Sequence, residues 1–206
     1  MKTEPSKGFV RILATEFVPV TISVVSLLLS TFNLYVNYLK TPDISFVVAP
    51  YINHVVDSRS GNEAFFIPVT MINRGARPGT VLSFELTVTR VSDKSQADYF
   101  AQYFGQQNDA AAVGQFFTPL SLNGYSSDSR TVCFYPAGAR SGRLFSGASD
   151  YVFVVSAVTA NVSASSRKAT KQTFVVHLTD QMTTVMAAQP NGEYPFPIPV
   201  ESNAAP

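Results

Sequence analysis

The chain has 206 residues, of which 46% are hydrophobic and only 14% are charged, and its formal net charge is +1. Soluble proteins average about 25% charged residues, so the deficit indicates a long uncharged segment. A net charge this close to zero argues against the strongly basic proteins that bind nucleic acid. The single cysteine, Cys133, excludes an intramolecular disulfide, and its apolar neighbours Val132 and Phe134 predict a buried thiol rather than a nucleophile.

The uncharged segment runs from Phe17 to Leu39 and is followed by Lys40. As an α-helix its 23 residues would be about 34 Å long, enough to cross a membrane. We therefore predict a single-pass transmembrane helix at 17–40, with Pro19 in its first turn. A cleaved signal peptide would need small residues at a cleavage site, which the end of the segment does not offer, and a buried core helix of this length would be unusual.

The basic residues around the segment indicate its orientation. Lys2, Lys7 and Arg11 precede it, whereas only Lys40 and Arg59 follow within about 20 residues. This difference favours a cytoplasmic N-terminus and a periplasmic or extracellular domain. The first 16 residues are either an interfacial extension of the helix or a short juxtamembrane segment without a role of its own.

Polar residues recur along one side of the predicted helix at spacings of three and four. These residues are Ser23, Ser26, Ser30, Asn33 and Asn37. Small and hydrogen-bonding residues at this spacing are typical of helix packing in lipid. We expect this stripe to dock against an integral membrane protein or a second copy of the chain. The alternative is that each serine bonds to its own helix backbone and the asparagines lie near the membrane surface.

Residues 41–188 have the composition of a single β domain. β-Branched and aromatic runs are separated by turn residues such as Asn123-Gly124, and the Thr41-Pro42 break opens the domain. We predict strands at 44–51, 64–73, 80–91, 113–122, 129–136, 151–160 and 171–180, with 64–91 forming a hairpin or an inter-sheet corner. Residues 181–188 would extend the last strand or form a short one.

Two segments depart from this pattern. In 93–112, Tyr99, Phe100, Tyr103 and Phe104 would share one face of a short helix, which we expect to pack on the sheet as a helical insertion. The tail, residues 189–206, is rich in proline, so we expect it to be extended or disordered, either as a docking segment or as an unstructured end.

The run AFFIPVTMINRGARPGTVLSFELTV (64–88) resembles the strand, Asn-x-Gly turn and strand of bacterial immunoglobulin-like domains. DYVFVVSAVT (150–159) and QTFVVHL (172–178) are similar to the last strand pair of such domains, with Tyr151 at the position of their corner tyrosine. The resemblance implies a mainly β fold, an antiparallel immunoglobulin-like β-sandwich. It also extends to uncharacterised bacterial proteins built as one N-terminal helix plus such a domain.

The sequence carries no familiar catalytic signature. His54 lies in a polar stretch that we expect to be a loop, and His177 lies in a predicted strand. Neither has a partner at metal-ligand spacing, and we predict no catalytic residue, cofactor or metal. Acidic residues occur singly, so a carboxylate pair could arise only through the fold.

These features favour a non-enzymatic accessory or scaffold subunit, which docks through its transmembrane helix and contacts partners through its β-sandwich. The lipid bilayer is then its second partner. The alternative is a receptor or adhesion-type module that binds a sugar or peptide. An enzyme is the third possibility, and a pocket holding His54 or His177 beside a carboxylate would support it.

Overall fold

The computed structural model describes residues 7–56, 61–106, 109–136, 138, 143–161, 164–188 and 196–202. The chain divides into two compact units, residues 1–41 and 42–206. The first unit is helical, and the second is built almost entirely of β-strands.

The first unit consists of the helix α1 (Lys7–Leu34), whose last turn continues as the π-helical segment η1 (Tyr35–Leu39). The backbone N–H of Lys40 donates to the carbonyl of Tyr35, which is the wider hydrogen-bond step of a π-turn. Phe17–Leu39 has a mean hydropathy of 1.8 and no buried residue, so it is long and apolar enough to cross a membrane. Because α1 already includes Lys7, Pro19 lies inside the helix, and the expectation of a first-turn proline is wrong.

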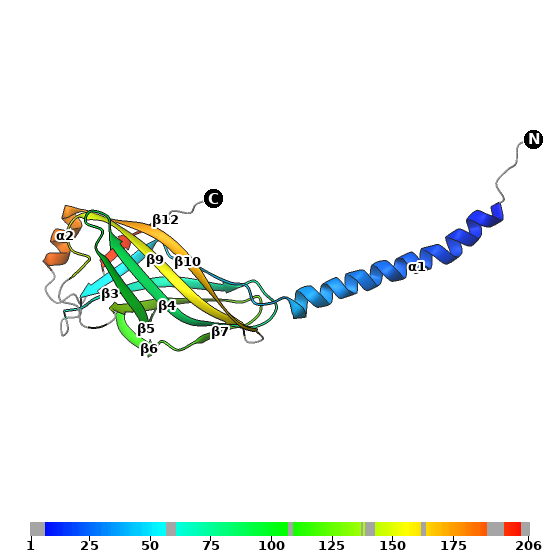
Figure 1. The fold of residues 1–206 in the computed structure, drawn as a ribbon, viewed down its shortest axis with the longest axis horizontal. Coiled ribbons are helices and arrows are strands. Elements are labelled where there is room, and N and C mark those ends of the chain that lie inside the picture. The colour runs from blue at the N-terminus through cyan, green and yellow to red at the C-terminus, as the bar shows by residue number, and fades with distance from the viewer. Residues whose placement is uncertain are drawn as a thin grey trace, which may run out of the picture. The chain divides into compact units, whose positions relative to one another are not determined.

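The second unit contains twelve described strands, and every pairing between them is antiparallel. The long strands β4, β9 and β10 lie side by side across the domain (Figure 1). The strands are β1 (Ile44–Val48), β2 (Tyr51–Val56), β3 (Glu63–Asn73), β4 (Gly79–Arg90), β5 (Gln96–Gln106), β6 (Asp109–Phe116), β7 (Leu120–Leu122), β8 (Ser127–Pro136), β9 (Ser149–Asn161), β10 (Ala164–Leu178), β11 (Phe196–Pro199) and β12 (Glu201–Ser202).

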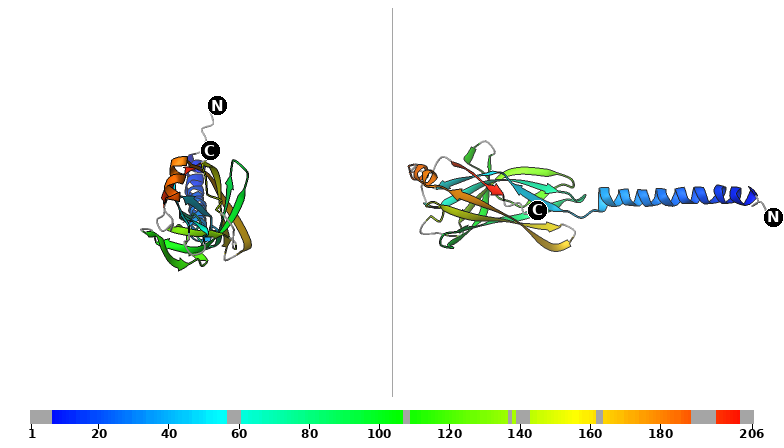
Figure 2. Two further views of the ribbon diagram at one scale, coloured as in Figure 1. Left: turned by 90° about the vertical axis from the view of Figure 1, so that its left-hand side faces the viewer. Right: turned by 90° about the horizontal axis from the view of Figure 1, so that it is seen from above.

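The strands form one sheet in the order β11-β2-β3-β8-β5-β4-β9-β10-β12. The sheet curls around a common interior (Figure 2). Its two ends are joined by the C-terminal segment 196–202, because β11 pairs with β2 and β12 pairs with β10. We call this segment the clasp. The domain is therefore a curled sheet whose two edges are bridged by the clasp.

The inner face of the sheet carries the hydrophobic core, and its largest side chains are aromatic. Phe65 lies at the centre, with ring centroids 5.0 Å from Tyr99, 5.2 Å from Phe153 and 5.5 Å from Phe145. All four residues are at most 2% exposed. A bulge in β4 between Val81 and Ser83 interrupts the alternation of that strand, so Val81 and Phe84, three residues apart, are both buried.

The structure confirms a mainly β, antiparallel domain with an N-terminal apolar helix. Its described strands join in one curled sheet, and an immunoglobulin-like sandwich is not confirmed. β3 and β4 are not paired, so 64–91 is a corner rather than a hairpin. The corner is held by Asn73, whose buried side-chain oxygen accepts from the N–H of Gly75 at 2.9 Å. The predicted pair formed by residues 151–160 and 171–180 is confirmed as β9 and β10.

The predicted helical insertion is wrong, because its described residues form β5 and β6. A bulge between Ala101 and Tyr103 breaks the two-residue alternation in β5, which made its aromatic spacing resemble a helix face. The predicted strand at 181–188 is also wrong. Thr179 caps a helix there, α2 (Asp180–Ala187), which lies at one end of the β domain (Figure 1).

Candidate functional site

The predicted docking stripe lies on α1 and η1, where all five of its side chains are exposed. The Ser23 hydroxyl donates to the carbonyl of Pro19 at 2.8 Å, so this side chain is hydrogen-bonded within its own helix. The side-chain amides of Asn33 and Asn37 make no hydrogen bond with another described residue. The stripe therefore contains one self-bonded serine and two unsatisfied amides.

His54 is buried in β2, not in the expected loop, and it faces Glu63 of β3. Its Nε2 lies 3.4 Å from Glu63 Oε2, yet the two atoms are poorly aligned for a hydrogen bond. The imidazole instead packs between Phe65 and Phe145, with ring centroids 5.3 and 5.0 Å away. The side chain of His54 is only 3% exposed, so a substrate in solution cannot contact the imidazole in this structure.

Glu63 has a clear structural role. Its carboxylate accepts hydrogen bonds from the backbone N–H groups of Leu144 and Phe145, the latter at 3.0 Å. These hydrogen bonds satisfy the acceptor oxygens of a carboxylate that is almost fully buried. Glu63 thereby anchors the segment before β9 to the start of β3.

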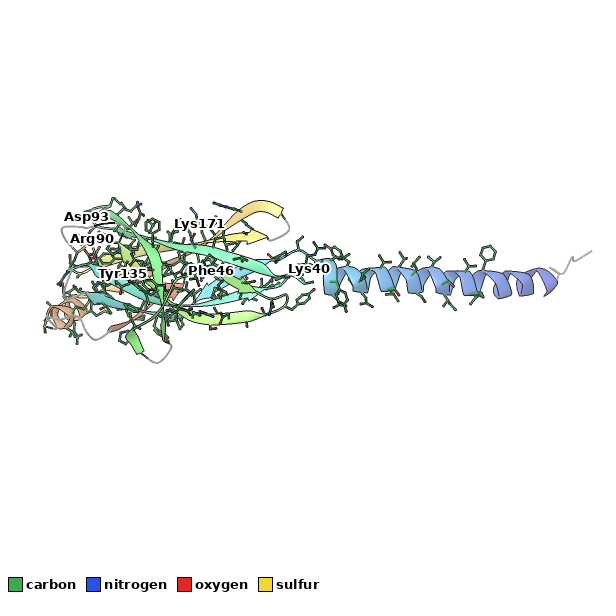
Figure 3. All side chains as sticks on the ribbon, turned by 90° about the horizontal axis from the view of Figure 1, so that it is seen from below. Lys40, Phe46, Arg90, Asp93, Tyr135 and Lys171 are labelled. Atoms are coloured by element: carbon green, nitrogen blue, oxygen red, sulfur yellow. The ribbon has the colours of Figure 1, made fainter. Side chains whose placement is uncertain are left out.

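Arg90 and Tyr151 hold the same segment through its carbonyls. Arg90 donates to the carbonyls of Leu144 and Ser146 and, through Nε, to the Tyr151 hydroxyl at 3.2 Å. The Tyr151 hydroxyl lies 3.1 Å from the carbonyl of Gly147. Burial raises the pKa of Tyr151, so the phenol stays protonated and can donate. Arg90 also pairs with Asp93 at the same end of the domain (Figure 3).

His177 is confirmed in a strand, at the end of β10, and its ring bridges two carboxylates. Nδ1 lies 2.6 Å from Asp150 Oδ1, and Nε2 lies 3.3 Å from Glu201 Oε2. The hydrogen bond to Asp150, followed by that to Glu201, raises the pKa of His177 above 6.5. The carboxylates lie at opposite ends of the ring, so they do not converge on one point. The group ties β9 and the clasp to β10.

A shallow pocket of about 380 Å³ lies where β5, β6 and β8 meet. Its one cationic side chain, Arg130, stands 4.9 Å from the centre of the Phe104 ring and pairs with Asp128 at 2.8 Å. The remaining lining comes from Gly105, Gly114, Gln115, Ser129 and Thr131. Because Asp128 already balances the guanidinium, the pocket offers little charge to an anion.

The predicted burial of Cys133 is confirmed, since the thiol is fully buried. Burial raises the pKa of Cys133 to about 12, so the reactive thiolate is not formed at neutral pH. Among the residues that the structure describes, no three His, Cys, Asp or Glu side chains are grouped to hold a metal. The carboxylate contacts of His54 and His177 depend on the fold and have no sequence spacing that could reveal them.

No protein-family model matches the chain, and no curated protein is significantly similar to it. Among solved structures, it is similar to a candidate ApaA protein from Bordetella pertussis, with 13% identity and a TM-score of 0.41 over 66% of this chain and 94% of that chain. It is also similar to the structural-genomics target SoR45, with 10% identity and a TM-score of 0.40 over 64% of this chain and 84% of that chain.

Proposed function

We propose that the chain is a non-enzymatic accessory or scaffold subunit, anchored in a membrane by 17–40 and docked to an integral membrane protein through the helix stripe. The observation that supports this most is the pair Asn33 and Asn37. Both amides are exposed and lack a partner among the described residues. An unpaired amide in contact with lipid tails is costly, so a second helix that hydrogen-bonds to the stripe would stabilise it.

The described polar groups of the β domain support a structural rather than a catalytic role. Glu63, Arg90 and Tyr151 use their polar atoms to hold the loop before β9. His177 is exposed on the sheet and already bonded at both nitrogens. The proposed orientation puts the domain on the periplasmic or extracellular side, on the strength of the three basic residues before the helix and the two after it.

The test is a pull-down of the tagged full chain in mild detergent, with Asn33→Leu/Asn37→Leu as the variant and Leu28→Ala/Phe32→Ala as a control on the opposite face of the helix. A stoichiometric membrane protein should accompany the wild type and the control, and be lost from the variant. Each Asn-to-Leu change makes the helix more apolar, so insertion should persist and can be checked by carbonate extraction. Recovery of the wild-type chain alone would refute the accessory function.

A further inference from the structure

The outer face of an antiparallel sheet usually carries polar side chains, because it meets water. One area of the outer face, over β3, β8, β5 and β6, instead gathers aromatic side chains. We call this area the aromatic platform and define it as Phe66, Phe100, Tyr103, Phe116 and Tyr135. Phe116 is 70% exposed and Phe100 is 43% exposed, which is unusual for large apolar side chains gathered on neighbouring strands.

Strand pairing explains why these rings lie together. Phe66 is paired with Cys133, Cys133 with Tyr103, and Tyr103 with Phe116, so one row crosses four strands. The ring centroids of Tyr103 and Phe116 are 5.0 Å apart, and those of Tyr103 and Tyr135 are 5.6 Å apart. At the usual strand spacing, the row is about 14 Å wide.

Only part of the platform is needed for the fold. Phe66 and Cys133 form a small buried cluster apart from the main core, and Tyr103 and Tyr135 cover it. The bulge in β5 after Ala101 directs both Phe100 and Tyr103 to the outer face. Phe100 and Phe116 extend beyond the small cluster, so their exposure calls for a partner.

The edge of the platform next to β4 is acidic. Glu85 is paired with Phe100 across β4 and β5, is exposed, and has no ion-pair partner among the described residues. Asp98, two residues from Phe100 on the same strand, is also exposed and accepts a hydrogen bond from the Thr87 hydroxyl at 2.9 Å. Lys171, which is labelled in Figure 3, lies two strands away from Glu85, because Glu85 is paired with Ser156 of β9 and Ser156 is paired with Lys171 of β10.

We propose that the aromatic platform, with Glu85 and Asp98, is an interaction surface for an extended Arg- or Lys-bearing segment of a partner protein. Cationic side chains would lie over the exposed rings of Phe100 and Phe116 and place their charges near the two carboxylates. Exposed aromatic anchors beside carboxylates fit such a segment better than an acidic one, which Glu85 and Asp98 would repel. This inference rests on the proposed accessory function, for which it names the partner chemistry.

The test is fluorescence anisotropy of labelled nine-residue peptides, alternating Arg-Ser or Glu-Ser, with the full chain in a non-ionic detergent. We expect saturable binding of the Arg-Ser peptide that weakens with salt, and no binding of the Glu-Ser peptide. Phe116→Ser and Glu85→Gln should each raise its Kd roughly 3- to 10-fold. Val47→Ser, at an apolar residue that is 51% exposed on β1, and Asp180→Asn are matched controls that should leave the Kd unchanged.

Equal binding of both peptides, absence of saturable binding up to millimolar peptide, or equal loss in the controls would overturn the proposal. So would binding of a neutral glucan oligosaccharide that depends on Phe116 while the Arg-Ser peptide fails to bind. Unchanged unfolding temperatures would show that the variants are folded. The peptide assay does not depend on the helix stripe. Failure of peptide binding would therefore leave the pull-down result unaffected, and failure of the pull-down would leave peptide binding unaffected.

Discussion

Replacing Ile198 tests the clasp directly. Ile198 is fully buried and is paired with Ile52 of β2. Ile-to-Ala changes in packed cores cost about 2–5 kcal/mol. The clasp can detach from the sheet instead of leaving a closed cavity, so the lower end of that range applies. We expect Ile198→Ala to lower the free energy of unfolding by about 2 kcal/mol, or the unfolding temperature by roughly 4–8 °C.

The measurement is urea denaturation of the full chain in mild detergent, accompanied by amide hydrogen exchange. Detachment of the clasp should speed exchange in β2 and at Val175, which pairs with Glu201 of the clasp. Val47→Ala, the same kind of truncation at an exposed residue of β1, should change the free energy of unfolding by less than 0.5 kcal/mol. A change equally small in Ile198→Ala, with unchanged exchange, would refute the role assigned to the clasp.

Three further predictions concern the polar groups. Tyr151→Phe removes the hydroxyl between Arg90 and the Gly147 carbonyl and should cost about 1–2 kcal/mol by urea denaturation; a cost below 0.5 kcal/mol would contradict the loop-holding role. Asn73→Ala, which removes bonds to five backbone groups, should cost about 3 kcal/mol in the same assay, and a cost near that of Tyr151→Phe would show that few of those bonds matter. Because the folded pKa of His177 is raised, its contribution should be fully present below pH 6.5 and lost as the pH rises through that higher pKa. Comparing unfolding temperatures of wild type and His177→Gln across pH 5–9 checks this, and a difference that grows toward high pH would contradict it.

The strands that could be predicted were those in which buried and less buried residues alternate with a period of two. β9 alternates between buried and half-buried residues from Tyr151 to Ala160, and its pairing with β10 was predictable. β5 was misassigned because its bulge shifts the phase between Tyr99 and Tyr103. α2 was misassigned although it carries both an N-cap threonine and Met182 and Met186 four residues apart, which pack against the core.

The polar contacts could not be predicted because they join residues far apart in sequence. Glu63 bonds to the N–H of Phe145, 82 residues away, and the polar stretch around His54 gave no sign that the imidazole is buried beside that carboxylate. The prolines of the tail, including those at 197 and 199, predicted only an extended or disordered segment. A proline can nevertheless occupy an edge strand, because it only removes a donor, and β11 is an edge of the sheet.

The clasp also determines when folding can finish. Phe196 pairs with His54, and Val175 pairs with Glu201, so the two edges of the sheet close only after nearly the whole β domain has been synthesised. Contacts of such long sequence separation are slow to form, because the closure of a long loop costs entropy before any contact repays it. Until then β2 and β10 present open edges that can pair with other chains. Folding yield should therefore depend on chain concentration, with aggregation through these two edges as the competing route.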